Sequence, residues 1–99
     1  MRAVVCVEPG RMELQHVPVP EPAPDEVIVR VEASGVCGSD IRGFHGRHPD
    51  IKDYPIILGH EYSGTIVALG SQASGPAIGT RVAVEPLTVC GRCRGCIEG

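Results

Sequence analysis

Hydrophobic positions along the chain recur with the two-residue period of β-strands and show almost no helical period. Val27, Val29 and Val31 share one face of the clearest run, while Arg30 and Glu32 lie on the other face, as expected for a half-buried strand. Five such runs are predicted as strands, at 1–7, 12–17, 26–33, 62–70 and 79–86. A turn at 8–11 makes the first two a hairpin, and the glycine inside 62–70 indicates a bulge or a close backbone approach.

The segments between these runs are irregular. Residues 17–26 contain four alternating prolines, which predict an extended surface connector because proline lacks an N–H group. Residues 34–48 contain four glycines, and only 40–42 favour a single helical turn. Short strands separated by glycine and proline turns predict a mainly β fold, a small barrel or sandwich with short helical turns.

Length and composition restrict the class of protein. The 99 residues form one domain at most, and 42% hydrophobic with 21% charged residues indicates a globular chain. A net charge of −3 argues against a nucleic-acid partner. No apolar run approaches the roughly 20 residues that span a bilayer, and no signal-like apolar segment opens the chain, so no membrane contact and a cytoplasmic location are expected.

The five cysteines are an odd number and make a poor disulfide framework. Cys6 lies in an alternating strand and is interpreted as a core residue. Cys90, Cys93 and Cys96 are separated by two residues each, a spacing that lets thiolates surround one metal ion. The spacing fits a zinc lobe or the start of an iron–sulfur pattern, and free reduced thiols are the alternative.

A second group of possible ligands is more dispersed. Cys37 stands in a glycine-rich turn, and His60-Glu61 follow Gly59 where a loop enters a strand. A catalytic zinc needs about three ligands of these types with one open position. The alternative is a buried cysteine and an unrelated surface pair, because the sequence distance between the two elements carries little information.

Three stretches together point to a family. They are Gly35-Val36-Cys37-Gly38-Ser39-Asp40, the box from Tyr54 to Gly64 that contains Gly59-His60-Glu61, and the cysteine cluster at 89–96. In this order they resemble the zinc-dependent medium-chain alcohol dehydrogenases, most closely the polyol and threonine dehydrogenase branch. The resemblance covers nearly the whole chain.

The resemblance implies a GroES-like small β-barrel over 1–99 and assigns roles to residues. Cys37 and His60 are then ligands of a catalytic zinc, Glu61 is a ligand or a carboxylate that exchanges with water, and Ser39 passes on the alcohol proton. Cys90, Cys93 and Cys96 supply three of four ligands of a structural zinc. The implied reaction moves a hydride from a secondary alcohol or polyol, bound to zinc as its alkoxide, to NAD(P)⁺, in a protein that is a homo-oligomer at full length.

Some features depart from the family pattern. Arg42 stands where many relatives have a histidine that carries the proton onward, and it stays protonated. His45 or His48 could take over this role, although solvated loop histidines are the alternative.

No G-x-G-x-x-G motif occurs, so the NAD(P)-binding Rossmann domain is expected outside this chain. The chain is therefore interpreted as an N-terminal catalytic-domain fragment that is inactive by itself. The competing hypothesis is a stand-alone GroES-like binding or assembly module without redox activity.

Overall fold

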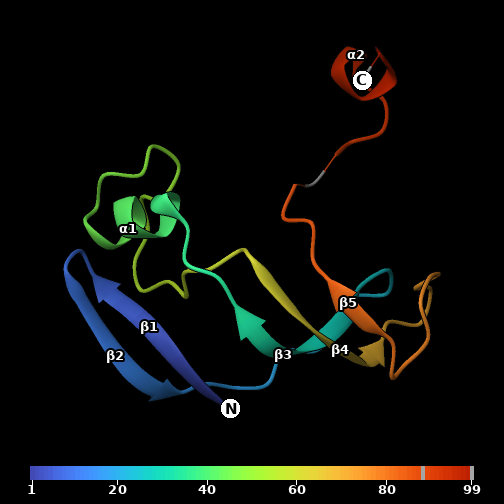
Figure 1. Ribbon diagram of the computed structural model, residues 1–99, viewed down its shortest axis with the longest axis horizontal. Coiled ribbons are helices and arrows are strands. Elements are labelled where there is room, and N and C mark those ends of the chain that lie inside the picture. Colours follow the sequence, from blue (N-terminus) through green and yellow to red (C-terminus); the bar gives the residue numbers. More distant parts are fainter. Residues whose placement is uncertain (88, 99) are drawn as a thin grey trace.

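A computed structural model describes residues 1–87 and 89–98 of the chain (Figure 1). The described part has five strands and two short helices, so the prediction of a mainly β fold is confirmed. In chain order the elements are β1 (Arg2–Glu8), β2 (Arg11–His16), β3 (Val27–Ser34), α1 (Gly38–Phe44), β4 (Tyr62–Leu69), β5 (Arg81–Ala83) and α2 (Arg94–Glu98).

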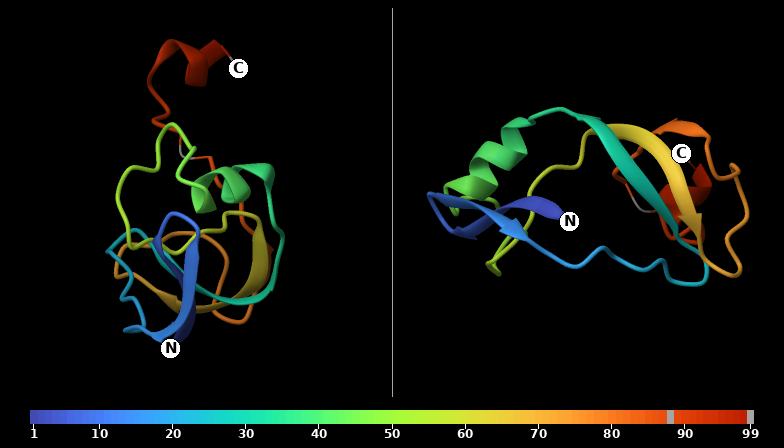
Figure 2. Two further views of the ribbon diagram at one scale, coloured as in Figure 1. Left: turned by 90° about the vertical axis from the view of Figure 1, so that its left-hand side faces the viewer. Right: turned by 90° about the horizontal axis from the view of Figure 1, so that it is seen from below.

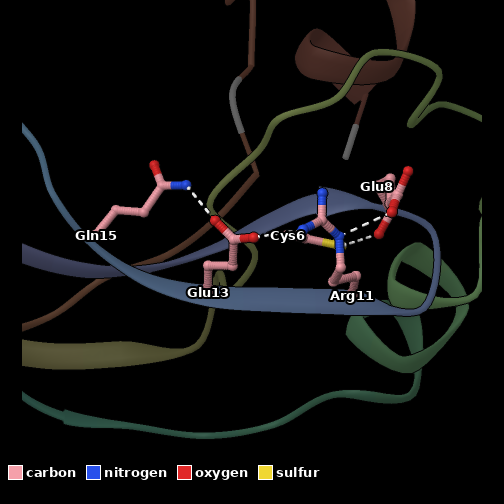
Figure 3. A network of polar contacts seen from close by, with 5 residues as sticks. All are labelled: Cys6, Glu8, Arg11, Glu13 and Gln15. Atoms are coloured by element: carbon pink, nitrogen blue, oxygen red, sulfur yellow. Dashed lines mark hydrogen bonds and ion pairs between the residues drawn. The ribbon is translucent and has the colours of Figure 1, made fainter.

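The first two strands form the predicted antiparallel hairpin. On its exposed surface Arg11 pairs with Glu8 at 2.8 Å and with Glu13 at 2.5 Å, and Gln15 donates to Glu13 at 3.0 Å (Figure 3). Exposed ion pairs of this kind contribute little to stability. Cys6 of β1 is fully buried, which confirms its interpretation as a core residue.

The second sheet has the order β3-β4-β5, and all its pairs are antiparallel. Gly64 of β4 confirms the expectation of a close backbone approach, because a Cβ at this position would lie 2.1 Å from the carbonyl oxygen of Arg30. The register between β3 and β4 shifts twice, between Ile28 and Val29 and between Val31 and Ala33. Irregularities of this kind bend a strand and increase its local twist.

One reciprocal bridge ties the hairpin to the long loop before β4. The Cys6 N–H donates to the Ile56 carbonyl at 2.8 Å, and the Ile56 N–H donates to the Cys6 carbonyl at 2.9 Å. The loop therefore crosses the hairpin and runs into β4, as the views in Figure 2 show. Among the described residues the buried apolar side chains are few, namely Val5, Cys6 and Ile66.

The predicted bounds of two elements were wrong by more than one residue at each end, and one helix was not predicted. The helical turn expected at 40–42 is the longer helix Gly38–Phe44, because a capping interaction starts it at Cys37. The strand expected at 79–86 is only Arg81–Ala83, which pairs with β4 over three residues. The unpredicted helix is Arg94–Glu98, and an ion pair of 2.7 Å joins its two end residues. Neither of the helices described is long and apolar enough to cross a membrane.

Candidate metal centre

Three possible metal ligands from two separate loops meet at one point. The ligand atoms of Cys37, His60 and Glu61 all lie within 4.8 Å of one another. Cys37 immediately precedes α1, whereas His60 and Glu61 immediately precede β4. The structure therefore brings together residues that the sequence places far apart.

The start of α1 positions Cys37. Its backbone N–H donates to Asp40 Oδ2 at 2.9 Å, and the Asp40 N–H donates to the Cys37 carbonyl at 3.1 Å. This exchange satisfies backbone groups at the helix start that have no partner inside the helix. The thiol is consequently held on a fixed backbone position.

The imidazole of His60 is oriented by the same aspartate. Gly59 has a φ of 113°, a conformation that favours glycine, and it turns the chain so that His60 reaches α1. His60 Nδ1 lies 3.3 Å from Asp40 Oδ1, an arrangement that places the ring proton on Nδ1 and leaves Nε2 with a lone pair. A carboxylate behind the ring is the usual support of a metal-binding histidine. Asp40 was not among the predicted site residues, although its place three residues after Cys37 is a capping signal.

The absence of a side chain at Gly35 creates room for the third group. The Gly35 N–H donates to the Glu61 carbonyl at 2.7 Å, and a Cβ on Gly35 would lie 2.7 Å from Glu61 Oε2. The Glu61 carboxylate is exposed and can be reached from solvent. A carboxylate in this position lies within reach of a metal ion shared with Cys37 and His60.

Charge pairing within the metal-free cluster favours the thiolate form of Cys37 and the protonated form of His60, and this histidine must lose its proton to bind a metal ion. Hydrogen bonds from the Ser39 hydroxyl, the Ser39 backbone N–H and His60 lower the pKa of Cys37. The hydrogen bond with Cys37 raises the pKa of His60, and burial opposes this effect. The thiolate is the form of cysteine that binds metal. A thiolate, an imidazole and a carboxylate fit the donor set of a zinc ion.

A cleft of about 520 Å³ opens beside these residues. Its lining includes Ser39, His48, Ile51, His60, Glu85 and Leu87. Ser39 Oγ lies 3.5 Å from His60 Nε2, so the hydroxyl faces the candidate ligands. Of the two loop histidines, His48 lines the cleft, whereas the exposed His45 caps the C-terminal end of α1. Arg42 is exposed in the last turn of α1.

Cys90, Cys93 and Cys96 form a second cluster, away from both sheets (Figure 1). The Sγ atoms of Cys93 and Cys96 are 3.3 Å apart, and those of Cys90 and Cys96 are 3.7 Å apart. Tetrahedral zinc with Zn–S bonds of about 2.3 Å requires sulfur atoms roughly 3.8 Å apart. The three thiols therefore fit one zinc ion with small adjustments.

Cys90 is expected to lose its proton at a lower pH than an ordinary cysteine thiol. A hydrogen bond from the Arg92 backbone N–H, followed by contacts with Cys93 and Cys96, lowers its pKa to about 7 from 9.0. Because the thiolate is the reactive form, alkylation of Cys90 by iodoacetamide in the chelator-treated chain should slow only as the pH falls below about 7. Mass spectrometry of timed samples measures this rate. The urea-unfolded chain is the control, and a midpoint near 9 in the folded chain would contradict the assignment.

Comparison with known proteins agrees with the resemblance to alcohol dehydrogenases that the sequence motifs indicate. The family model described as the alcohol dehydrogenase GroES-like domain matches residues 23–99. The sorbitol dehydrogenase of Bacillus subtilis (strain 168) is 43% identical over all of this chain, and a zinc-type alcohol dehydrogenase-like protein of Escherichia coli (strain K12) is 44% identical over 92% of it. The crystal structure of an alcohol dehydrogenase from E. coli CFT073 complexed with NADH superposes over 99% of this chain with a TM-score of 0.86 and 34% identity.

All three similar proteins are much longer than the 99 residues. The chain spans 29% and 27% of the length of the two curated relatives, and 28% of the length of the NADH complex.

Proposed function

Because this chain belongs to the alcohol dehydrogenase GroES-like domain family, we propose that it is the catalytic-domain part of a zinc-dependent dehydrogenase that oxidises a secondary alcohol or polyol with NAD(P)⁺. The observation that carries the proposal is the convergence of Cys37, His60 and Glu61 beside a cleft. A binding module without redox chemistry has no need of these three residues together. NAD(P)⁺ is bound by a Rossmann domain outside 1–99, and the complete protein forms a homo-oligomer.

The residues that would hold the catalytic zinc are Cys37, His60 and Glu61. A zinc ion bound there would lower the pKa of an alcohol oxygen, as it does that of water, and so make loss of hydride from the carbon easier. Asp40 acts through two of these residues, because it holds the Cys37 backbone and the His60 ring at the same time. Asp40 is therefore a positioning residue.

Ser39 is the group that receives the alcohol proton. Its hydroxyl lines the cleft and lies 3.5 Å from His60 Nε2. A hydroxyl can accept one proton while it donates another, so it can pass a proton outward without holding a charge. Arg42 in the same helix cannot take the next step because its guanidinium remains protonated. The proton therefore leaves Ser39 through the open cleft toward solvent.

Cys90, Cys93 and Cys96 would hold a second, structural zinc, with a fourth ligand from elsewhere in the protein. The close sulfur atoms support this role. Structural zinc sites of this kind contribute directly to folding free energy.

The complete protein, loaded with zinc, provides the test. We expect about two zinc ions per chain by elemental analysis, and formation of NADH or NADPH when sorbitol or another secondary alcohol is added. The isolated chain 1–99 is the matched control and should not turn over. A zinc-loaded complete protein that reduces neither nucleotide with a panel of secondary alcohols would refute the dehydrogenase assignment.

A further inference from the structure

His48 differs from the neighbouring His45 in its surroundings. It is half-buried and lines the cleft that also contains Ser39 and His60. His45 is exposed and is not part of the cleft lining. An imidazole in a cleft of this kind can serve as a base for a proton or as a donor to a ligand oxygen, and its hydrogen bonds decide between the two roles.

One ring nitrogen of His48 is already engaged. The backbone N–H of Asp50 donates to His48 Nδ1 at 3.2 Å, so Nδ1 carries the lone pair. The neutral ring then has its proton on Nε2, which becomes a hydrogen-bond donor. A proton could enter the ring only at Nδ1, where it would displace the Asp50 N–H. The geometry therefore favours a donor over a proton-accepting base.

Other residues of the cleft suit an oxygen-rich ligand. Glu85 lines the cleft with a carboxylate that accepts the Leu87 N–H at 3.2 Å and has further acceptor capacity. Ile51 and Leu87 supply apolar surface beside these polar groups. A donor and an acceptor from separate segments, set among apolar groups, fit the alternating hydroxyls and carbons of a polyol better than a simple alcohol.

We propose that His48 is a specificity-determining residue that donates an Nε2–H hydrogen bond to a polyol hydroxyl other than the one that is oxidised. This inference rests on the proposed dehydrogenase function and narrows its substrate class to polyhydroxylated secondary alcohols. A substrate that lacks this hydroxyl cannot make this hydrogen bond and is therefore bound less tightly in the transition state.

The test compares sorbitol with 2-butanol, a secondary alcohol without a second hydroxyl, in the zinc-loaded complete protein. His48→Leu removes the donor at similar size, and the ratio of kcat/KM for sorbitol to that for 2-butanol should fall roughly 10- to 100-fold. The loss should appear mainly in the KM for sorbitol. His48→Gln, which retains an N–H donor, should restore much of the ratio, and His45→Leu is the matched control from the same loop.

Each other outcome contradicts a definite part of the proposal. An equal fall in kcat for both alcohols, with a shifted pH profile, would show that His48 relays a proton instead. An unchanged ratio in a protein that oxidises both alcohols would overturn the His48 assignment alone. A wild-type protein that oxidises no member of a panel of secondary alcohols, these two included, would overturn the proposed function and this inference with it.

Discussion

Replacement of His60 by alanine, or of Cys37 by serine, is expected to lower kcat/KM of the complete protein at least roughly 10³-fold, because each change removes a ligand from the catalytic metal. The same variants should lose about one zinc ion per chain. The structure supports this expectation through the 4.8 Å convergence of the three ligand groups. Steady-state kinetics and elemental analysis on the same preparations measure both effects.

The controls for these variants come from the same chain. His16 lies on β2, outside the cleft lining, and His16→Ala removes an imidazole without changing the cluster.

Asp40→Asn keeps the size of the side chain but weakens its support of His60, and we expect zinc affinity to fall about 10- to 100-fold. Full zinc content and turnover in His60→Ala would mean that the imidazole is not a ligand.

The strands were predictable because their signal is local. Alternating valines identify the strand that contains Val29, and a turn of proline and glycine identifies the hairpin. The close approach at Gly64 was also predictable, since a glycine inside a strand often marks a place where another backbone comes near. Boundaries were less predictable where pairing decides them. The last strand keeps only Arg81–Ala83 because its antiparallel register with β4 covers three residues.

The candidate site required information that the sequence carries only indirectly. Motif resemblance named Cys37, His60, Glu61 and Ser39, but nothing in their spacing placed them together. The support that Asp40 gives to His60 could not be recognised, because this contact exists only after Gly59 turns the loop back onto α1. The length of α1 was underestimated for a related reason. The helix starts where the Asp40 carboxylate accepts a hydrogen bond from the backbone N–H of Cys37.

The two loop histidines, His45 and His48, show most clearly why the sequence alone could not predict every residue of the site. Both follow α1, both are titratable, and the sequence offers no reason to separate them. The structure separates them, because His48 lines the cleft together with residues 85–87 from beyond β5, whereas His45 is not part of the cleft lining. Distant chain segments therefore decide which of two similar side chains meets a ligand.

Ser39→Ala is expected to lower kcat about 10²- to 10⁴-fold, the range for loss of a positioned proton-transfer group. The deficit should shrink as the pH rises, because deprotonation of the alcohol then depends less on a relay. Zinc content must be measured as well, since the Ser39 hydroxyl also lowers the pKa of Cys37. Ser39→Thr retains the hydroxyl and should restore most of the rate. Normal kcat of Ser39→Ala at every pH, with full zinc, would mean that the proton leaves by another route and that the 3.5 Å approach to His60 is only structural.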